Sequence, residues 1–258
     1  MIPPAIVDRP RAGSPLNIVI LAAGDSTRMR SQTPKVLHVL AGHPLIDYST
    51  RLAEALTDLP PVVVVGRDAE KVQAFLGNRA RYVYQAERLG TGHAVLQARS
   101  LLAEQPGTVL VFYGDMPLLT EESMRRLLDL HHRDKQAVLS MLTFESDQPR
   151  GFGRIVRDQA GQVVAIVEEA DCTPEQLRIS ELNPGLYCYD ADWLWANIER
   201  MRVNAAGELN LTDLVEIAVS DGETVQTIAC DPQEILGINT QEQLAKIERL
   251  LAARSGYI

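Results

Sequence analysis

The sequence of 258 residues predicts an α/β fold, in which a mostly parallel sheet is covered by helices on both faces. Short β-branched apolar runs alternate with segments of helical spacing up to about residue 145, and turn residues bound each run. Hydrophobic residues make up 46% of the chain, enough to bury a large core. After about residue 145 the regular alternation of strand and helix patterns ends. This indicates a second portion of α+β character, which we expect to close over the loops of the first portion.

The predicted elements follow from these patterns in chain order. In the first portion we expect strands at 17–21, 61–65, 80–84, 108–112 and 137–142, and helices at 44–56, 68–76, 90–105 and 120–132. In the second we expect a hairpin at 153–169, a short helix at 172–178, strands at 185–189 and 224–230, and helices at 190–201, 211–220 and 240–253. Ligands of such parallel sheets bind beyond the carboxyl ends of the strands, so the loops from Ala22, Gln85 and Tyr113 are the candidates.

Charge and composition exclude several classes of protein. The formal charge of −9 argues against general binding to nucleic acid or to an anionic membrane surface. The three cysteines have neither disulfide-framework nor zinc spacing, which favours a reducing compartment. Residues 1–16 are rich in proline and contain no signal-peptide core, so we expect a flexible tail on a cytoplasmic protein without a membrane span.

The loop after the first strand, LAAGDSTRMRSQTPK at residues 21–35, indicates an anion site. Gly24 lets backbone N–H groups approach a ligand closely. Arg28, Arg30 and Lys35 against Asp25 give this loop a net charge of 3 − 1 = +2 within an acidic chain. The spacing matches neither a P-loop nor GxGxxG. The alternative is an ordinary polar turn with solvated arginines.

Two further segments lie at the same edge of the predicted sheet. Asp115 follows a buried strand, where a carboxylate can ligate Mg²⁺ bound to phosphate oxygens, although it could equally cap a turn. Gly90, Thr91 and Gly92 begin a helix and could lie flat against a nucleotide base, or form only a tight strand-to-helix turn.

An ordered set of motifs resembles one enzyme family. Over residues 17 to about 253 the chain contains, in order, LAAGDSTRMRSQTPKVLH, YQAERLGTGHA, YGDMPLL, GFGRI, AIVEE, ELNPG, GELNLTD and GIN. Their order and spacing are similar to those of the N-acetylglucosamine-1-phosphate uridyltransferases, the pyrophosphorylase half of a bifunctional enzyme.

The resemblance implies a Rossmann-like nucleotide-diphospho-sugar transferase fold and a reaction. UTP and N-acetylglucosamine 1-phosphate would give UDP-N-acetylglucosamine and pyrophosphate, by metal-assisted in-line attack on the α-phosphate. The implied nucleotide-binding residues are Ala23, Gly24, Gln85, Gly90 and Thr91. The implied catalytic residues are Arg28 and Lys35, the implied Mg²⁺ ligands are Asp115 and Asn239, and the implied sugar-binding residues are Gly153, Glu168 and Asn183.

We expect one nucleotidyltransferase domain at 17–258, with a nucleotide-binding portion at 17–145 and a sugar-binding portion at 146–258. The family's acetyltransferase repeats are not seen before Ile258, so we expect no acetyltransferase activity, and the oligomeric state is left open. Asp25, Ser26, Pro184 and the pair Leu209-Asn210 depart from the family pattern. They keep two alternatives open: a pyrophosphorylase for another sugar 1-phosphate or NTP, and a catalytically inactive nucleotide-sugar sensor. An NAD-dependent oxidoreductase is disfavoured because the glycines of its signature are missing.

Overall fold

The structure, a computed structural model, describes residues 14–24, 29, 31, 33–134, 136–149 and 151–255. Its strands in the main sheet are β1 (Leu16–Leu21), β4 (Val62–Val65), β5 (Arg81–Tyr84), β6 (Thr108–Tyr113), β7 (Ala137–Glu145), β11 (Tyr187–Asp190) and β12 (Thr224–Ala229). Its helices are α1 (Leu45–Leu56), α2 (Ala69–Leu76), α3 (Thr91–Leu102), α4 (Glu121–Arg133), α5 (Ala191–Asn197), α6 (Asp213–Ser220) and α7 (Gln241–Ser255).

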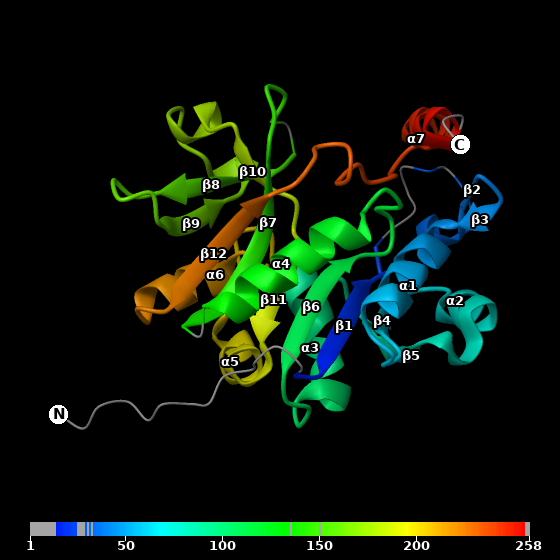
Figure 1. Ribbon diagram of the computed structural model, residues 1–258, viewed down its shortest axis with the longest axis horizontal. Coiled ribbons are helices and arrows are strands. Elements are labelled where there is room, and N and C mark those ends of the chain that lie inside the picture. The colour runs from blue at the N-terminus through cyan, green and yellow to red at the C-terminus, as the bar shows by residue number, and fades with distance from the viewer. Residues whose placement is uncertain are drawn as a thin grey trace.

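The main sheet has the order β5-β4-β1-β6-β11-β7, with β12 on β7, and is mostly parallel as predicted (Figure 1). The pairs β5–β4, β4–β1, β1–β6 and β7–β12 are parallel. β11 is the exception, since it pairs antiparallel with both β6 and β7. A strand from the second half of the chain therefore lies between two strands from the first half, and both halves share one sheet.

A smaller antiparallel part of the sheet begins at the end of β7, where β10 (Glu181–Asn183) pairs with it. This part consists of β10, β8 (Gly153–Arg157) and β9 (Val163–Val167), in that order from β7. β8 and β9 form the predicted hairpin. The predicted helix at 172–178 is instead a short 3-10 turn at Gln176–Arg178, because the proline at 174 leaves too few residues for an α-helix. A two-stranded hairpin, β2 (Val39–Leu40) and β3 (His43–Pro44), lies near α7 (Figure 1).

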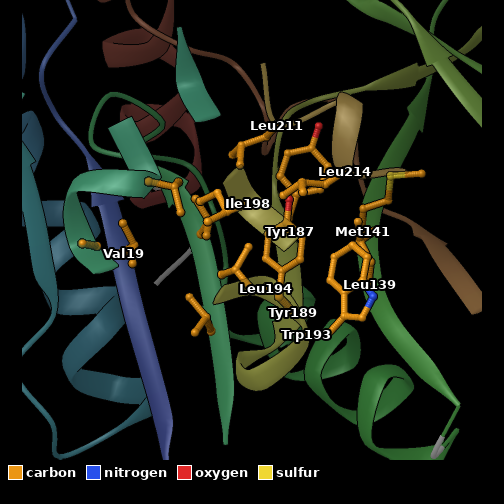
Figure 2. Packing of buried hydrophobic residues seen from close by; sticks show 14 of the residues in the cluster. Val19, Leu139, Met141, Tyr187, Tyr189, Trp193, Leu194, Ile198, Leu211 and Leu214 are labelled. Carbon is orange, nitrogen blue, oxygen red and sulfur yellow. The ribbon is translucent and has the colours of Figure 1, made fainter. Parts of the chain in front are cut away.

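Helices cover both faces of the main sheet because its strands are nearly continuous apolar runs, whose successive side chains point to opposite faces. On β1, Val19 and Leu21 pack in one core cluster with buried residues of α3, α5 and α6. Ile18 and Ile20 point the other way and pack with residues of α1, α2 and α4. Figure 2 shows part of the first cluster, in which Tyr187 and Tyr189 of β11 lie among residues of β7 and α5. The result is a three-layer sandwich with the carboxyl ends of the parallel strands at one edge.

α7 belongs to a third, smaller cluster. Ile247 of this helix is 1% exposed and packs with Met29, Leu40, Leu45, Leu118 and Ile238. Met29 lies in the segment that follows β1, so the end of the chain packs against the predicted nucleotide loop. This contact places the start of α7 at the edge of the sheet where ligands are expected.

Candidate functional site

A cavity of about 1150 Å³ opens at the carboxyl edge of β1, β5 and β6. Eleven of the twelve sequence-predicted site residues line this cavity, all except Arg28. Arg28 lies outside the described residues, as do Asp25 and Ser26. The cavity exceeds the size of an ordinary single-ligand pocket, so it has room for two substrates.

Lys35, Asp115 and Asn239 meet at one point of this cavity. Lys35 Nζ lies 2.5 Å from Asp115 Oδ2 and donates to Asn239 Oδ1 at 2.9 Å. The Lys35 and Asp115 side chains are only 13% and 10% exposed, so this ion pair is shielded from water. Three segments far apart in the sequence thus bring one cation and two oxygen ligands together.

The backbone explains why these segments meet. Lys35 begins a 3-10 turn at Lys35–Leu37 after Pro34. Asp115 follows β6, and its backbone oxygen accepts a hydrogen bond of 3.0 Å from Ile238 N. Asn239 immediately follows Ile238, and its backbone N donates to Gln243 of α7 at 2.7 Å. The strand end and the helix start therefore fix the two oxygen ligands independently of Lys35.

Gln85, Gly90 and Thr91 line the side of the cavity next to β5 and α3. Gln85 follows β5, is 4% exposed, and donates from its side-chain amide to Gly90 O at 3.2 Å. Gly90 has φ +97°, and a Cβ there would lie 2.4 Å from Leu209 O. Only glycine fits this position, since both its backbone conformation and its surroundings exclude a side chain.

Thr91 connects this wall to the second half of the chain. Its hydroxyl oxygen accepts a hydrogen bond of 3.1 Å from Leu211 N. The segments at 89–92 and 209–211 also form two backbone hydrogen bonds. Leu209 N donates to Leu89 O at 2.7 Å, and Gly92 N donates to Leu209 O at 2.8 Å. The side-chain oxygen of Thr91 is therefore already engaged in holding the segment that leads into α6.

Gly153, Glu168 and Asn183 lie together at the other end of the cavity. Gly153 on β8 pairs with Asn183 on β10, and a Cβ at Gly153 would lie 3.6 Å from Glu168 Oε2. Thr212 donates a hydrogen bond of 3.3 Å to Glu168 Oε1. Burial raises the pKa of Glu168 above its ordinary value, more than the Thr212 hydrogen bond lowers it, and nearby carboxylates raise it further.

Asn183 already has two partners within the protein. Its side-chain amide donates to Tyr187 OH at 2.7 Å, and its oxygen accepts from Gly185 N at 3.0 Å. These bonds shape the Pro184–Gly185 turn between β10 and β11, and Pro184 itself has no N–H to donate. One amide hydrogen and one oxygen lone pair of Asn183 are left for a ligand.

Several residues that line the cavity are not among the twelve predicted site residues. Tyr113, Arg88, Asn210, Gln243 and Lys246 all line the cavity. Tyr113 ends β6, and burial raises the pKa of its hydroxyl. Arg88, Gln243 and Lys246 carry no local signal, because a single polar residue in a loop or on an exposed helix face resembles any solvated side chain. Only the packing of α7 shows that Gln243 and Lys246 face the cavity.

The last turn of α4 contains two histidines, His131 and His132, that pack toward the sheet. His131 is 4% exposed and its Nδ1 lies 2.9 Å from Ser140 Oγ. His132 Nε2 lies 3.0 Å from Thr108 Oγ1, and burial lowers its pKa. Both histidines stabilise the packing of α4 on the sheet, away from the cavity.

The described residues contain no group of three or more His, Cys, Asp or Glu side chains arranged to hold a metal ion. In the part of the chain that the structure covers, no helix has the length and apolarity needed to traverse a bilayer.

Comparison with known proteins gives a consistent result. A family model described as "MobA-like NTP transferase domain" matches residues 18–178. The chain is 47% identical over 239 residues to a protein of Burkholderia vietnamiensis and 45% identical over 241 residues to one of Heliobacterium modesticaldum, both named "Bifunctional protein GlmU". The alignments cover 91% and 92% of this chain and 52% of each relative. The chain therefore spans about half the length of these relatives.

Two solved structures share the fold. One is a CMP:2-keto-3-deoxy-manno-octonic acid synthetase complexed with CTP, with a TM-score of 0.70, 18% identity and coverage of 93% of this chain and 100% of that one. The other is described as a glucose-1-phosphate thymidylyltransferase from Bacillus anthracis, with a TM-score of 0.69, 19% identity and coverage of 92% and 95%. At these identities the likeness concerns the fold alone.

Proposed function

The chain belongs to the MobA-like NTP transferase domain family, and we propose that it forms UDP-N-acetylglucosamine and pyrophosphate from UTP and N-acetylglucosamine 1-phosphate. Its similarity to proteins named GlmU and the ordered motifs of the sequence support this choice of substrates. The observation that carries the proposal is the meeting of Lys35, Asp115 and Asn239 at one point of a cavity large enough for two substrates.

The reaction needs positioned charge more than a base. An oxygen of the sugar phosphate, already ionised at neutral pH, forms a bond to the α-phosphorus of UTP. The bond from that phosphorus to the β-phosphate bridging oxygen breaks, and pyrophosphate leaves with the electron pair. Lys35 lies where its ammonium group can offset the charge that develops on the phosphates. Gly153, Glu168 and Asn183 would hold the sugar at the far end, so that its phosphate faces the nucleotide.

The site also fits a divalent cation. Nucleotidyltransferases of this family generally use a divalent metal, and we propose Mg²⁺. Asp115 and Asn239 already direct oxygen atoms at one cation, the Lys35 ammonium group. Two protein oxygens suit Mg²⁺, which usually takes its other ligands from substrate phosphates and water. Bound there, the ion would neutralise phosphate charge, while Asp115 and Asn239 hold it and Lys35 turns to the phosphates.

The proposed substrates and the three free cysteines are consistent with a cytoplasmic protein, as the sequence predicts.

Because Asn183 is partly engaged by its own turn, a pyrophosphorylase for another sugar 1-phosphate is the second candidate.

The test is pyrophosphate release with Mg²⁺, in which UTP, dTTP, CTP and ATP are crossed with the 1-phosphates of N-acetylglucosamine, glucosamine, glucose and N-acetylgalactosamine. We expect turnover to be greatest with UTP and N-acetylglucosamine 1-phosphate. Greater turnover with another sugar would favour the second candidate, and no turnover with any pair would favour a nucleotide-sugar sensor.

Lys35→Ala is expected to lower kcat by about 10² to 10³, because it removes a positioned charge from a shielded site. Lys71→Ala is the matched control, since Lys71 is an exposed lysine on α2 that pairs only with Asp68 in the part of the chain described. Equal activities of the two variants would contradict the role proposed for Lys35.

A further inference from the structure

His93, in the first turn of α3, contacts the side chain of Gln85 inside the cavity wall. The Gln85 amide nitrogen lies 3.2 Å from Gly90 O and 3.1 Å from His93 Nδ1. A backbone carbonyl can only accept a hydrogen bond, so the Gln85 atom that faces it is the NH₂ group. Its second hydrogen then points at His93 Nδ1, which must accept it.

These contacts determine what Gln85 can offer to a ligand. If both amide hydrogens are bound by Gly90 and His93, the side-chain oxygen is the polar atom of Gln85 that remains for the cavity. That oxygen is an acceptor. It suits uracil, which has an N–H donor at ring position 3, and opposes cytosine, which has a lone pair there.

The contact requires neutral His93 with its hydrogen on Nε2. A second contact opposes this tautomer, since Gln97 Nε2 lies 3.2 Å from His93 Nε2 and also donates to His93 O at 2.9 Å. Gln85 is 4% exposed, whereas Gln97 is half-buried. An unmet hydrogen bond costs more at the buried residue, because water can compensate the more exposed one. Burial therefore favours the tautomer that satisfies Gln85.

We propose that His93 is a positioning residue that keeps the Gln85 oxygen toward the cavity and thereby favours a uracil over a cytosine nucleotide. The proposal rests on the proposed function, since it concerns the base of the same substrate. Thymine has the same edge as uracil at ring position 3, so this contact discriminates against cytosine and leaves UTP and dTTP alike.

Equilibrium binding of UTP and CTP to the full chain, measured by calorimetry without sugar phosphate, tests the proposal. His93→Leu is expected to reduce the ratio of UTP to CTP affinity by roughly 3- to 10-fold, which is the effect of one neutral hydrogen bond. His93→Asn should restore the ratio, because its side-chain oxygen can accept from Gln85 in place of Nδ1. His132→Leu is the control, since it removes a histidine contact of similar length, to Thr108, outside the cavity. An unchanged ratio in a folded His93→Leu variant would overturn the proposal.

The tautomer of His93 is an independent measurement on the ligand-free protein. Long-range ¹H–¹⁵N NMR spectra distinguish a hydrogen on Nε2 from one on Nδ1, with His93→Asn identifying the signal. A hydrogen on Nε2 is expected, and a hydrogen on Nδ1 would overturn the proposal whatever nucleotide the protein binds. Failure of the wild type to bind UTP would instead contradict the proposed function, so the two failures are distinguishable.

Discussion

At the scale of single residues, the burial of Glu168 has two consequences. It affects the pH dependence of sugar binding, and it affects the stability of the folded protein. Burial raises its pKa above the ordinary value of 4.5. The carboxylate that would accept hydrogen bonds from the sugar is therefore lost, as the pH falls, at a higher pH than for an exposed glutamate. We expect the KM for the sugar 1-phosphate to rise over that range while the KM for UTP changes less. Parallel pH profiles of the two KM values would contradict this role.

The same pKa shift has a consequence for folding. The pKa of Glu168 is higher in the folded than in the unfolded protein, so its proton stabilises the folded state at low pH and this contribution is lost as the pH rises through the folded pKa. At neutral pH the buried charge is destabilising. Glu168→Gln should therefore raise Tm at pH 7 while it impairs sugar binding, and a lower Tm for the variant would contradict this reasoning.

The residue predictions from sequence succeeded to different degrees, for physical reasons. Parallel strands place their carboxyl ends at one edge, so the sequence could predict that the loops at Ala22, Gln85 and Tyr113 share a site. It could not predict that Lys35 Nζ pairs directly with Asp115, because two side chains 80 residues apart meet only through the tertiary packing of the loops that carry them. The roles assigned to the described site residues stay predictions until they are measured.

At the scale of elements, Gly90 joins α3 to the segment before α6. Its backbone, with φ +97° and ψ 176°, lies in a region that glycine alone adopts readily, and a Cβ would lie 2.4 Å from Leu209 O. Gly90→Ala should therefore destabilise the protein by more than the 1–3 kcal/mol expected, as an order of magnitude, from the backbone conformation alone.

Gly222→Ala is the matched control in urea denaturation. Gly222 also has a positive φ, +74°, but nothing lies within 4 Å of an added Cβ. The difference between the two variants reports the contact with Leu209 together with the strain of the ψ 176° backbone at Gly90. Equal losses of stability would show that the segment at 209–211 can move away from an added Cβ at no measurable cost in free energy of unfolding.

The elements themselves were predictable where their pattern is local. The strands at β1, β4, β5 and β6 and the helices α1 to α4 begin and end within a few residues of their predicted bounds, because apolar period and turn residues specify them. The antiparallel insertion of β11 between β6 and β7 was not predictable. Both faces of β11 are buried, as are those of the parallel strands. Its side chains therefore do not reveal whether it pairs parallel or antiparallel with its neighbours.

At the scale of the whole molecule, the shared sheet predicts cooperative folding. β6 pairs with β1 on one side and with β11 on the other, and β11 comes from the second half of the chain. We expect a single calorimetric transition with equal calorimetric and van 't Hoff enthalpies. A chain cut after residue 145 should lack a cooperative transition, because the edge of β6 and its apolar side chains would be exposed. Two separate transitions in the whole chain would contradict this expectation.

If Lys35 has the role proposed for it, its pairing is expected to make the site selective among anions before any chemistry occurs. Its ammonium group already has oxygen partners in Asp115 and Asn239, so an incoming anion gains only the difference between old and new partners. Chloride or free phosphate would draw Lys35 away and leave the nearly buried Asp115 carboxylate without a cation. A nucleotide that arrives with its divalent ion would replace both partners at once, because the ion would pair with Asp115 and the phosphates with Lys35. We therefore expect the ion pair to favour the binding of metal-bound nucleotides over that of the simple salts of the cell.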